Sequence, residues 1–233
     1  MTARKSTKKK PAKPAARKAR ARLTGGGRAR ATVSVDLGER SYGIEIGEDW
    51  LETIGRRAAA RLDVEKVALV TVSSVSRRYA PALTRGLQAA GVRVRKVIVP
   101  DGDANKNLNE LGKLYDAFLD HGLDRGSAVV TLGGGVAGDL GGFAAATFLR
   151  GIPFVQVPTT VLAMVDASIG GKTGINLPQG KNLAGAFHQP RGVYLDTATL
   201  RSLPARERAA GFAELIKAAV IWDADFFDWL EPR

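Results

Sequence analysis

The 233-residue chain is 45% hydrophobic and has no cysteine. This composition is ample for a buried core, and it excludes disulfide bonds and thiolate metal sites. The net charge of +12 is confined to one end, because residues 1–30 hold twelve Lys and Arg and no acid, so the remaining 23 basic residues balance all 23 acidic ones. The longest uncharged stretch, residues 151–165, is too short to span a membrane. These features predict a soluble, cytoplasmic protein without a membrane partner.

The basicity belongs to residues 1–31, which are rich in Lys, Arg, Ala and Pro and almost lack large apolar side chains. Such a segment cannot bury enough surface to fold and is predicted to be a disordered tail. Attraction to nucleic acid is physically available to it. We favour the simpler interpretation of a solvated tail, so no nucleic-acid partner is expected.

From residue 32 onward the chain alternates between predicted strands and helices. Alternating polarity indicates strands over 32–35 and 41–46, and helical spacing follows over 50–62. Further strands are predicted over 67–71, 92–99, 129–132, 154–157 and 193–195, with helices over 77–90 and 108–121. This order predicts an α/β fold with a parallel sheet covered by helices on both faces.

The strand at 129–132 ends abruptly at Gly133, Gly134 and Gly135, and a small-residue helix follows. Such a turn lets backbone N–H groups and the positive end of a helix approach a phosphate. The spacing also fits the dinucleotide fingerprint G-x-G-x-x-G. However, residues 140–165 contain no acid to bind the ribose, as the usual fingerprint requires. A plain strand-to-helix connection remains the alternative at this point.

Polar groups and glycines are concentrated between residues 159 and 182. Lys172 and Lys181 are expected in glycine-bracketed loops beyond strand ends, where α/β sheets bind their ligands. Two ammonium groups in such loops favour a phosphate site, with a solvated lysine surface as the alternative. Asp166 follows an apolar run and is expected at the surface of the cleft, paired with Lys172. Asp166 also stands where a P-loop needs glycine, which excludes that motif.

The last thirty residues predict two helices, from Pro204 to about Trp222 and over 224–230. Glu207, Glu214 and Lys217 fall on one stripe of the first helix. Glu214 lies in an apolar patch, so it is expected to be buried, either as part of an ion pair or as a metal ligand. The aromatic residues of the second helix have no evident partner, which suggests a domain that is cut short.

Six short motifs occur in order along the chain, at residues 133–139, 157–160, 165–173, 180–183, 185–190 and 213–217. This series closely resembles the 3-dehydroquinate synthase family of the sugar-phosphate cyclases. The resemblance implies a nucleotide-binding α/β domain (32–203) followed by the start of an all-helical domain (204–233). It also implies a lyase of the shikimate pathway, hence of chorismate and aromatic amino acid biosynthesis, with bound NAD, a divalent metal (zinc or cobalt), and a homodimer when complete.

In that family, 3-deoxy-arabino-heptulosonate 7-phosphate is oxidised by NAD, loses phosphate, is reduced again and closes to 3-dehydroquinate. The resemblance places substrate contacts at Asp166, Lys172, Asn182 and Lys217, the metal at Glu214, and at Arg150 an arginine that reaches the phosphate in the neighbouring subunit. The implied NAD contacts are Asp101, Gly102, Asp103, Ala104, Asn105, Lys106, Gly134, Gly135, Val136, Ala137, Gly138, Asp139, Thr159, Thr160, Lys172, Lys181, Thr199, Leu200, Arg201 and Ser202.

The sequence departs from the family pattern near the cofactor and at the metal, and mildly at Asp103 and Ser202, where Glu and Thr are usual. Val72 and Ser74 stand where the family usually has Asp and Asn near the cofactor. The two histidine metal ligands of the family would follow residue 233, and His121 and His188 do not match them. The chain alone is therefore predicted to be inactive and to bind metal poorly. Three alternatives remain: another sugar-phosphate cyclase, a polyol dehydrogenase of the glycerol dehydrogenase type, and a nucleotide-binding remnant tethered to nucleic acid by its tail.

Overall fold

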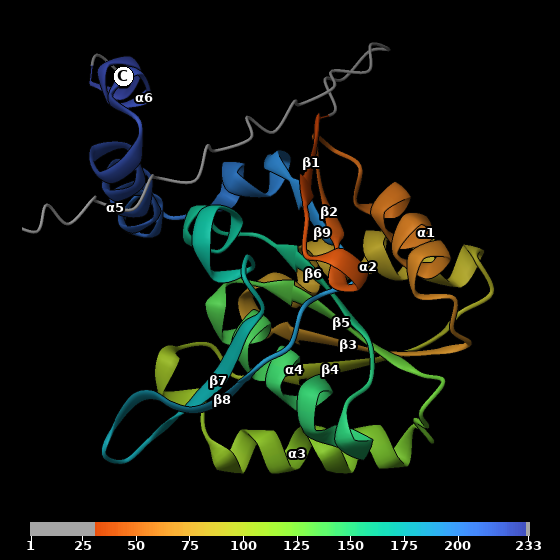
Figure 1. The fold of residues 1–233 in the computed structure, drawn as a ribbon. Coiled ribbons are helices and arrows are strands. Elements are labelled where there is room, and N and C mark those ends of the chain that lie inside the picture. Colours follow the sequence, from red (N-terminus) through yellow and green to blue (C-terminus); the bar gives the residue numbers. More distant parts are fainter. Residues whose placement is uncertain (1–30, 232–233) are drawn as a thin grey trace, which may run out of the picture.

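A computed structural model describes residues 31–231, so the predicted tail lies outside the described residues except for Ala31. One sheet of seven strands runs through this part of the chain, in the order β1-β2-β9-β6-β5-β3-β4 (Figure 1). All neighbours are parallel except β1 and β2, which confirms the predicted parallel sheet. The bounds are β1 (Ala31–Val35), β2 (Tyr42–Gly47), β3 (Lys66–Val72), β4 (Arg93–Val99), β5 (Ala128–Gly133), β6 (Phe154–Pro158) and β9 (Val193–Asp196).

Helices cover both faces of the sheet. Side chains alternate along each strand, so Leu69 and Val130 belong to a core under α1 (Leu51–Leu62) and α2 (Ser73–Ala89). Their neighbours Val70 and Val129 belong to a second core under α3 (Leu108–Asp120) and α4 (Gly135–Thr147). Because both faces are buried, the central strands are apolar throughout and appear in the sequence as continuous hydrophobic runs.

The α2 helix begins four residues earlier than the predicted start at Arg77, directly at the end of β3. No side chain of its own N-cap residue binds its first turn. Instead the carboxylate of Asp101, at the end of β4, accepts hydrogen bonds from the Ser74 backbone N–H (2.9 Å) and hydroxyl (2.6 Å). A cap supplied from a different strand leaves no local sequence signal, so the periodicity alone placed the start too late.

Lys172 and Lys181 lie on strands, and not in loops as the sequence predicted. They belong to a two-stranded antiparallel hairpin of β7 (Lys172–Leu177) and β8 (Gly180–Phe187) beside the main sheet. The two strands approach so closely that a Cβ on Gly185 would lie 2.1 Å from the Thr173 carbonyl oxygen. Glycines that normally indicate loops here permit close strand pairing, which explains the wrong prediction.

The last two helices, α5 (Ala205–Trp222) and α6 (Ala224–Leu230), project away from the sheet (Figure 1). The α5 helix meets the rest of the molecule at Gly211, which packs against Val161 and Leu162. Much of its apolar surface is exposed, including Val220, Ile221 and Trp222. Both helices were predicted, whereas the domain boundary at residue 204 stays a prediction.

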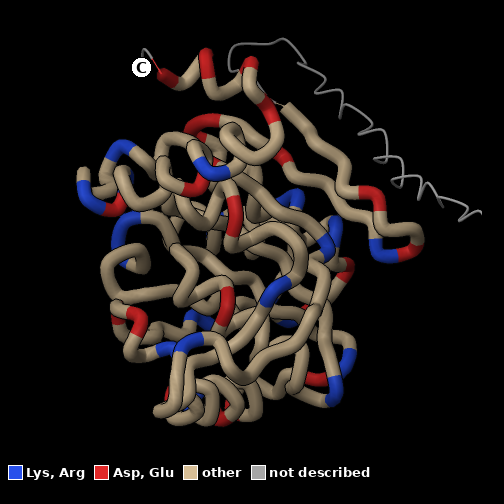
Figure 2. The backbone as a smooth tube through the Cα atoms, turned by 60° about the vertical axis from the view of Figure 1, so that its left-hand side comes forward, with Lys and Arg blue, Asp and Glu red and all other residues tan. Residues whose placement is uncertain are grey.

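Short helical segments complete the described chain. A π-helical turn spans Ala163–Ala167, and 3-10 segments span Gly38–Arg40, Asp103–Asn105, Phe148–Arg150 and Thr197–Ser202. Basic and acidic residues are interspersed over the described backbone (Figure 2). No helix within residues 31–231 is long and apolar enough to cross a membrane.

Candidate functional site

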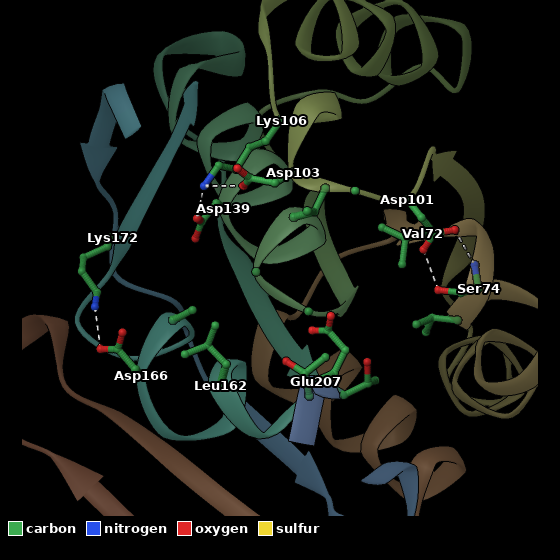
Figure 3. Close-up of a pocket in the computed structure, with 18 of the residues that line it drawn as sticks. Val72, Ser74, Asp101, Asp103, Lys106, Asp139, Leu162, Asp166, Lys172 and Glu207 are labelled. Carbon is green, nitrogen blue, oxygen red and sulfur yellow. Dashed lines mark hydrogen bonds and ion pairs between the residues drawn. The ribbon is translucent and has the colours of Figure 1, made fainter. Parts of the chain in front are cut away.

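A cavity of about 1100 Å³ opens where β3, β4, β5 and β6 end, between α4, the β7–β8 hairpin and the start of α5 (Figure 3). Ligands of open α/β sheets bind at the carboxyl ends of the strands. The cavity brings together fifteen of the residues that the resemblance assigned: Asp101, Gly102, Asp103, Lys106, Gly134, Gly135, Val136, Asp139, Thr159, Thr160, Asp166, Lys172, Asn182, Thr199 and Ser202.

The glycine turn lines this cavity. The α4 helix starts at Gly135, and no side chain of its N-cap residue Gly134 caps it. A Cβ on Gly135 would meet no protein atom within 4 Å, so the first turn of the helix faces open space. Unsatisfied N–H groups and the helix dipole make such a position suitable for an anion. The turn therefore fits the pyrophosphate of a dinucleotide.

Lys106 is a buried cation that joins three parts of the site. Its side chain is about 6% exposed, and its Nζ donates to Asp139 Oδ2 at 2.8 Å and to Asn182 Oδ1 at 2.5 Å. Burial raises the pKa of the Asp139 carboxyl, and the hydrogen bond from Lys106 opposes that rise. Because Asn182 is on β8 and Asp139 on α4, Lys106 holds the hairpin against the helix that carries the glycine turn.

A second group of contacts fastens the segment 101–106 to the hairpin. Lys181 Nζ lies 2.8 Å from Asp103 Oδ2, and this hydrogen bond lowers the pKa of Asp103 below its usual value. Asn176 on β7 donates its amide to Asp103, its backbone N–H to the Lys106 carbonyl (2.7 Å), and accepts from the Asn182 N–H (2.9 Å). Sequence analysis missed Asn176, because its partner Asp103 lies 73 positions away and no local pattern indicates the contact.

The predicted pair of Asp166 and Lys172 is confirmed, with Lys172 Nζ 2.8 Å from Asp166 Oδ1. The two side chains are 43% and 51% exposed and line the cavity at the end opposite Asp101 (Figure 3). Asp166 is on the π-helical turn, a distortion that is frequent at functional sites. A half-exposed ion pair contributes little to stability, so both groups can turn to a ligand.

Ten of the assigned residues do not line the cavity. Lys181 is at its margin, paired with the lining residue Asp103. Arg201 instead pairs with Asp49 and Glu48, and these acids raise the pKa of the Arg201 guanidinium. The others are Ala104, Asn105, Ala137, Gly138, Arg150, Leu200, Glu214 and Lys217.

The α5 helix brings Glu214 and Lys217 together as an ion pair, and this hydrogen bond raises the pKa of Lys217. Glu214 is 29% exposed and not buried as expected, because nothing in the described residues covers its side of α5. The two histidines serve the fold: His121 ends α3, and His188 stacks on Phe154 and lies 2.9 Å from the Ile152 carbonyl oxygen. Within residues 31–231 no three His, Cys, Asp or Glu side chains gather closely enough to hold a metal. The described residues alone thus do not fit a divalent metal.

Four other residues that line the cavity were not predicted as site residues. The sequence placed them in helices or strands, or showed them as departures from the family pattern. Val72 and Ser74 lie at the end of the cavity near Asp101 (Figure 3). Tyr79 also lines the cavity, and its hydroxyl lies 2.5 Å from Ser202 Oγ. Glu207 enters from the start of α5. The spacing of apolar residues predicts that Tyr79 lies on a helix. This spacing is the same whether the ring packs in a core or faces a ligand, so the sequence could not indicate that Tyr79 lines the cavity.

Comparison with known proteins shows the family to which this chain belongs. The family model described as 3-dehydroquinate synthase N-terminal matches residues 96–210. The 3-dehydroquinate synthase of Desulforamulus reducens is 51% identical over 202 residues, which are 87% of this chain and 56% of the relative. The chain belongs to the 3-dehydroquinate synthase family. It spans about half the length of the curated 3-dehydroquinate synthases it matches.

Two solved structures of related cyclases resemble the fold of this 3-dehydroquinate synthase family member. One is 2-deoxy-scyllo-inosose synthase in complex with carbaglucose-6-phosphate, NAD+ and Co2+, with a TM-score of 0.74 and 30% identity, covering 80% of this chain and 50% of the other. The second is 2-epi-5-epi-valiolone synthase from Streptomyces hygroscopicus subsp. jinggangensis with NAD+ and Zn2+ bound. It has a TM-score of 0.75 and 30% identity, covering 85% of this chain and 54% of the other.

Proposed function

We propose that this chain forms the NAD-binding half of a 3-dehydroquinate synthase, which converts 3-deoxy-arabino-heptulosonate 7-phosphate to 3-dehydroquinate and phosphate. The observation that carries the proposal is one cavity that is lined both by an open helix N-terminus and by the Lys172–Asp166 pair. Identity of 51% to a curated 3-dehydroquinate synthase, against 30% to the other two cyclases, favours this substrate over theirs.

The glycine turn is the proposed seat of the NAD pyrophosphate. First-turn N–H groups of α4, at Gly135 and Val136, donate to the phosphate oxygens, and the absence of a Cβ at Gly135 lets them approach. The buried Lys106 offsets the negative charge of Asp139 beside the turn, so that this carboxylate repels the pyrophosphate less. NAD bound at this turn would supply the reversible hydride-transfer chemistry that the reaction needs.

The hairpin end of the cavity is the proposed seat of the sugar phosphate. Lys172 is the ammonium group there that is exposed enough to bind an anionic substrate, and Asp166 orients it. Asn182, fixed by Lys106 and Asn176, presents its amide from the same hairpin. Binding by these groups would hold the substrate beside the nicotinamide and orient the leaving phosphate.

The other assignments belong to the complete protein. Zinc or cobalt would need ligands beyond the described residues, with Glu214 as the contribution of this chain, so no step is assigned to the metal. Lys217, next to Glu214 on α5, would face the substrate once a helical domain covers that helix. Arg150 is exposed at the end of its 3-10 segment, consistent with a role across a homodimer interface. We place the complete enzyme in the cytoplasm.

A chimera tests the proposed reaction. This chain is fused to the part of the Desulforamulus reducens relative that lies beyond the matched region, and phosphate release from 3-deoxy-arabino-heptulosonate 7-phosphate is measured. We expect turnover that requires catalytic NAD and a divalent metal, and none from the unfused chain. The Lys172→Ala chimera should lose at least about a hundredfold of kcat/KM, as expected when a charged contact to substrate is removed.

The same assay separates the rivals. Turnover of a different sugar phosphate in preference to this substrate would assign the chain to another cyclase. Net reduction of free NAD by a polyol would identify a dehydrogenase. A chimera that folds, binds NAD and releases no phosphate would contradict the proposed function.

A further inference from the structure

The β7–β8 hairpin (Figure 1) is irregular at one place. The regular ladder pairs on either side of that place are Ile175 with Ala184 and Leu177 with Gly180. Between them β7 contributes one residue, Asn176, whereas β8 contributes three, residues 181–183. This is a β-bulge, which bends a strand and re-aims its side chains, and such bulges are frequent next to active sites.

Asn182, in the centre of the bulge, has a conformation that depends on its surroundings. Its φ of 55° lies in the left-handed region, which is unfavourable for residues with a side chain, although asparagine tolerates it better than most. In this conformation the Asn182 side-chain oxygen accepts a hydrogen bond from Lys106 Nζ, and the residue lines the cavity. Such backbone conformations persist only where neighbouring groups hold them.

The side-chain amide of Asn176 holds the bulge from two directions. Its Oδ1 accepts the Asn182 backbone N–H at 2.9 Å, in place of the ladder hydrogen bond that the bulge removes. Its Nδ2 donates to the Asp103 carbonyl oxygen at 3.0 Å and to the Asp103 carboxylate at 3.1 Å. Asn176 is half-buried and does not line the cavity, so it would affect a ligand only through the residues that it holds.

We propose that Asn176 is a positioning residue, which holds Asn182 in the left-handed conformation that presents the Asn182 amide to the sugar phosphate. The proposal deepens the proposed function and rests on it. Lys106 occupies the Asn182 oxygen, whereas Asn182 Nδ2 donates to no acceptor within residues 31–231 and is left for a hydroxyl or phosphate oxygen of the substrate. If Asn176 served the fold alone, the effect of removing it would not depend on whether residue 182 has a side chain.

The test is a double-mutant cycle in the chimera described above, in which kcat/KM for 3-deoxy-arabino-heptulosonate 7-phosphate is measured at saturating NAD. Asn176→Ala alone should lower kcat/KM at least about tenfold, because a substrate contact that is displaced by an ångström loses much of its effect. Asn182→Gly removes the side chain but keeps the left-handed conformation accessible. In the Asn182→Gly background, Asn176→Ala should change kcat/KM by less than about twofold, since the two residues act through one contact.

Hydrogen exchange of the whole purified chain, without fusion, tests the same hydrogen bond independently of activity. The Asn182 N–H should exchange at least about tenfold faster in Asn176→Ala than in the wild type, because it loses its acceptor. The N–H of Val130, which is buried on β5, should stay protected in both proteins.

Asn107→Ala is the matched control. The Asn107 side chain also joins two backbone groups, the Glu110 N–H and the Ala104 carbonyl oxygen, but it does not line the cavity. Its kcat/KM should stay within about twofold of the unmodified chimera, since no contact with Asn182 is lost.

The outcomes separate the proposal from the proposed function. An equal loss of kcat/KM from Asn176→Ala in both backgrounds, or unchanged exchange of the Asn182 N–H, would overturn the positioning role and leave the proposed function intact. An unmodified chimera that binds NAD and releases no phosphate would overturn both. If Asn176→Ala fails to fold, as judged by its melting temperature, Asn176→Ser takes its place in the cycle, because the shorter serine hydroxyl cannot reach both partners.

Discussion

Tyr194 on β9 is buried beside Trp50, with ring centroids 6.5 Å apart, and burial raises the pKa of its phenol to about 12. In the unfolded chain the phenol ionises near pH 10. Above that pH the unfolded state loses a proton that the folded state keeps, so the free energy of unfolding falls as pH rises.

The fall in the free energy of unfolding with rising pH gives a testable prediction for Tyr194. Between about pH 9 and about pH 11 the wild type should lose about 1 kcal/mol more stability than Tyr194→Phe, which has no phenol to ionise. Urea denaturation of both proteins at the two pH values measures the difference. Equal losses would show that Tyr194 titrates normally.

Lys106 gives a second prediction, because it is the partner of a buried carboxyl. In Lys106→Met, Asp139 loses its cation, and the free energy of unfolding near neutral pH should fall by about 1 to 3 kcal/mol. Since burial already raises the pKa of Asp139, the cost grows as pH rises above the unfolded value of 3.8 and is relieved on acidification. Chemical denaturation at several pH values measures it.

The control for Lys106→Met is Arg93→Met, which breaks the exposed pair of Arg93 and Glu65. That variant should change stability by less than about 1 kcal/mol, because exposed ion pairs contribute little. The double variant Lys106→Met/Asp139→Asn should recover part of the lost stability. Equal losses in Lys106→Met and the control would contradict a structural role for the buried network.

Among the elements, α5 approaches the rest of the molecule most closely at one glycine. A Cβ on Gly211 would lie 2.4 Å from Val161 Cβ and 2.5 Å from the Leu162 backbone nitrogen. We therefore expect Gly211→Ala to displace α5, lower stability by about 1 to 3 kcal/mol, and speed protease cleavage within α5. Denaturation and limited proteolysis measure the two effects.

Gly112→Ala is the matched control, since Gly112 is also in a helix, α3, and a Cβ there would meet nothing within 4 Å. It should stabilise the chain by about 0.5 to 1 kcal/mol, because alanine favours the helix over glycine. A Gly211→Ala variant that behaves like this control would show that α5 does not pack closely on residues 161 and 162.

Whether the sequence predicts an element depends on how far apart in the sequence the residues that form it lie. The apolar strands and amphipathic helices were predictable because burial makes the central strands continuously apolar and gives each helix an apolar period. The β7–β8 hairpin was not, because Gly174 and Gly185 serve cross-strand approach and resemble loop residues. The same holds at the site. The Asp166–Lys172 pair, six residues apart, was predicted, whereas the Asn176–Asp103 and Ser74–Asp101 contacts join segments that meet only in the folded molecule.

At the scale of the molecule, the exposed apolar side of the last helices predicts a measurable property. Ile216, Val220, Ile221 and Trp222 are each 46% exposed or more. Exposed apolar surface of this extent binds hydrophobic dyes. The chain should enhance anilinonaphthalene sulfonate fluorescence in its folded state, and Val220→Lys combined with Ile221→Lys should remove most of the enhancement.

Leu119→Lys on α3 is the control for the dye measurement, because Leu119 is 62% exposed but lies on a different helix. It should leave the fluorescence nearly unchanged. In the chimera described above, a covering helical domain should lower dye binding as well. Strong dye binding that persists in the α5 double variant would place the exposed apolar surface elsewhere.

The edge of the sheet at β4 has a consequence for aggregation. An outermost strand carries unpaired backbone groups along one side, to which a strand of another molecule can add. On β4 the exposed side chains include Arg93, Arg95 and Lys96. An incoming strand would have to remove water from these cations. If the strand came from a second copy of this chain, it would also bring its own lysines and arginines beside them. Fibre-like growth through this edge is therefore disfavoured, whatever concentration the protein reaches.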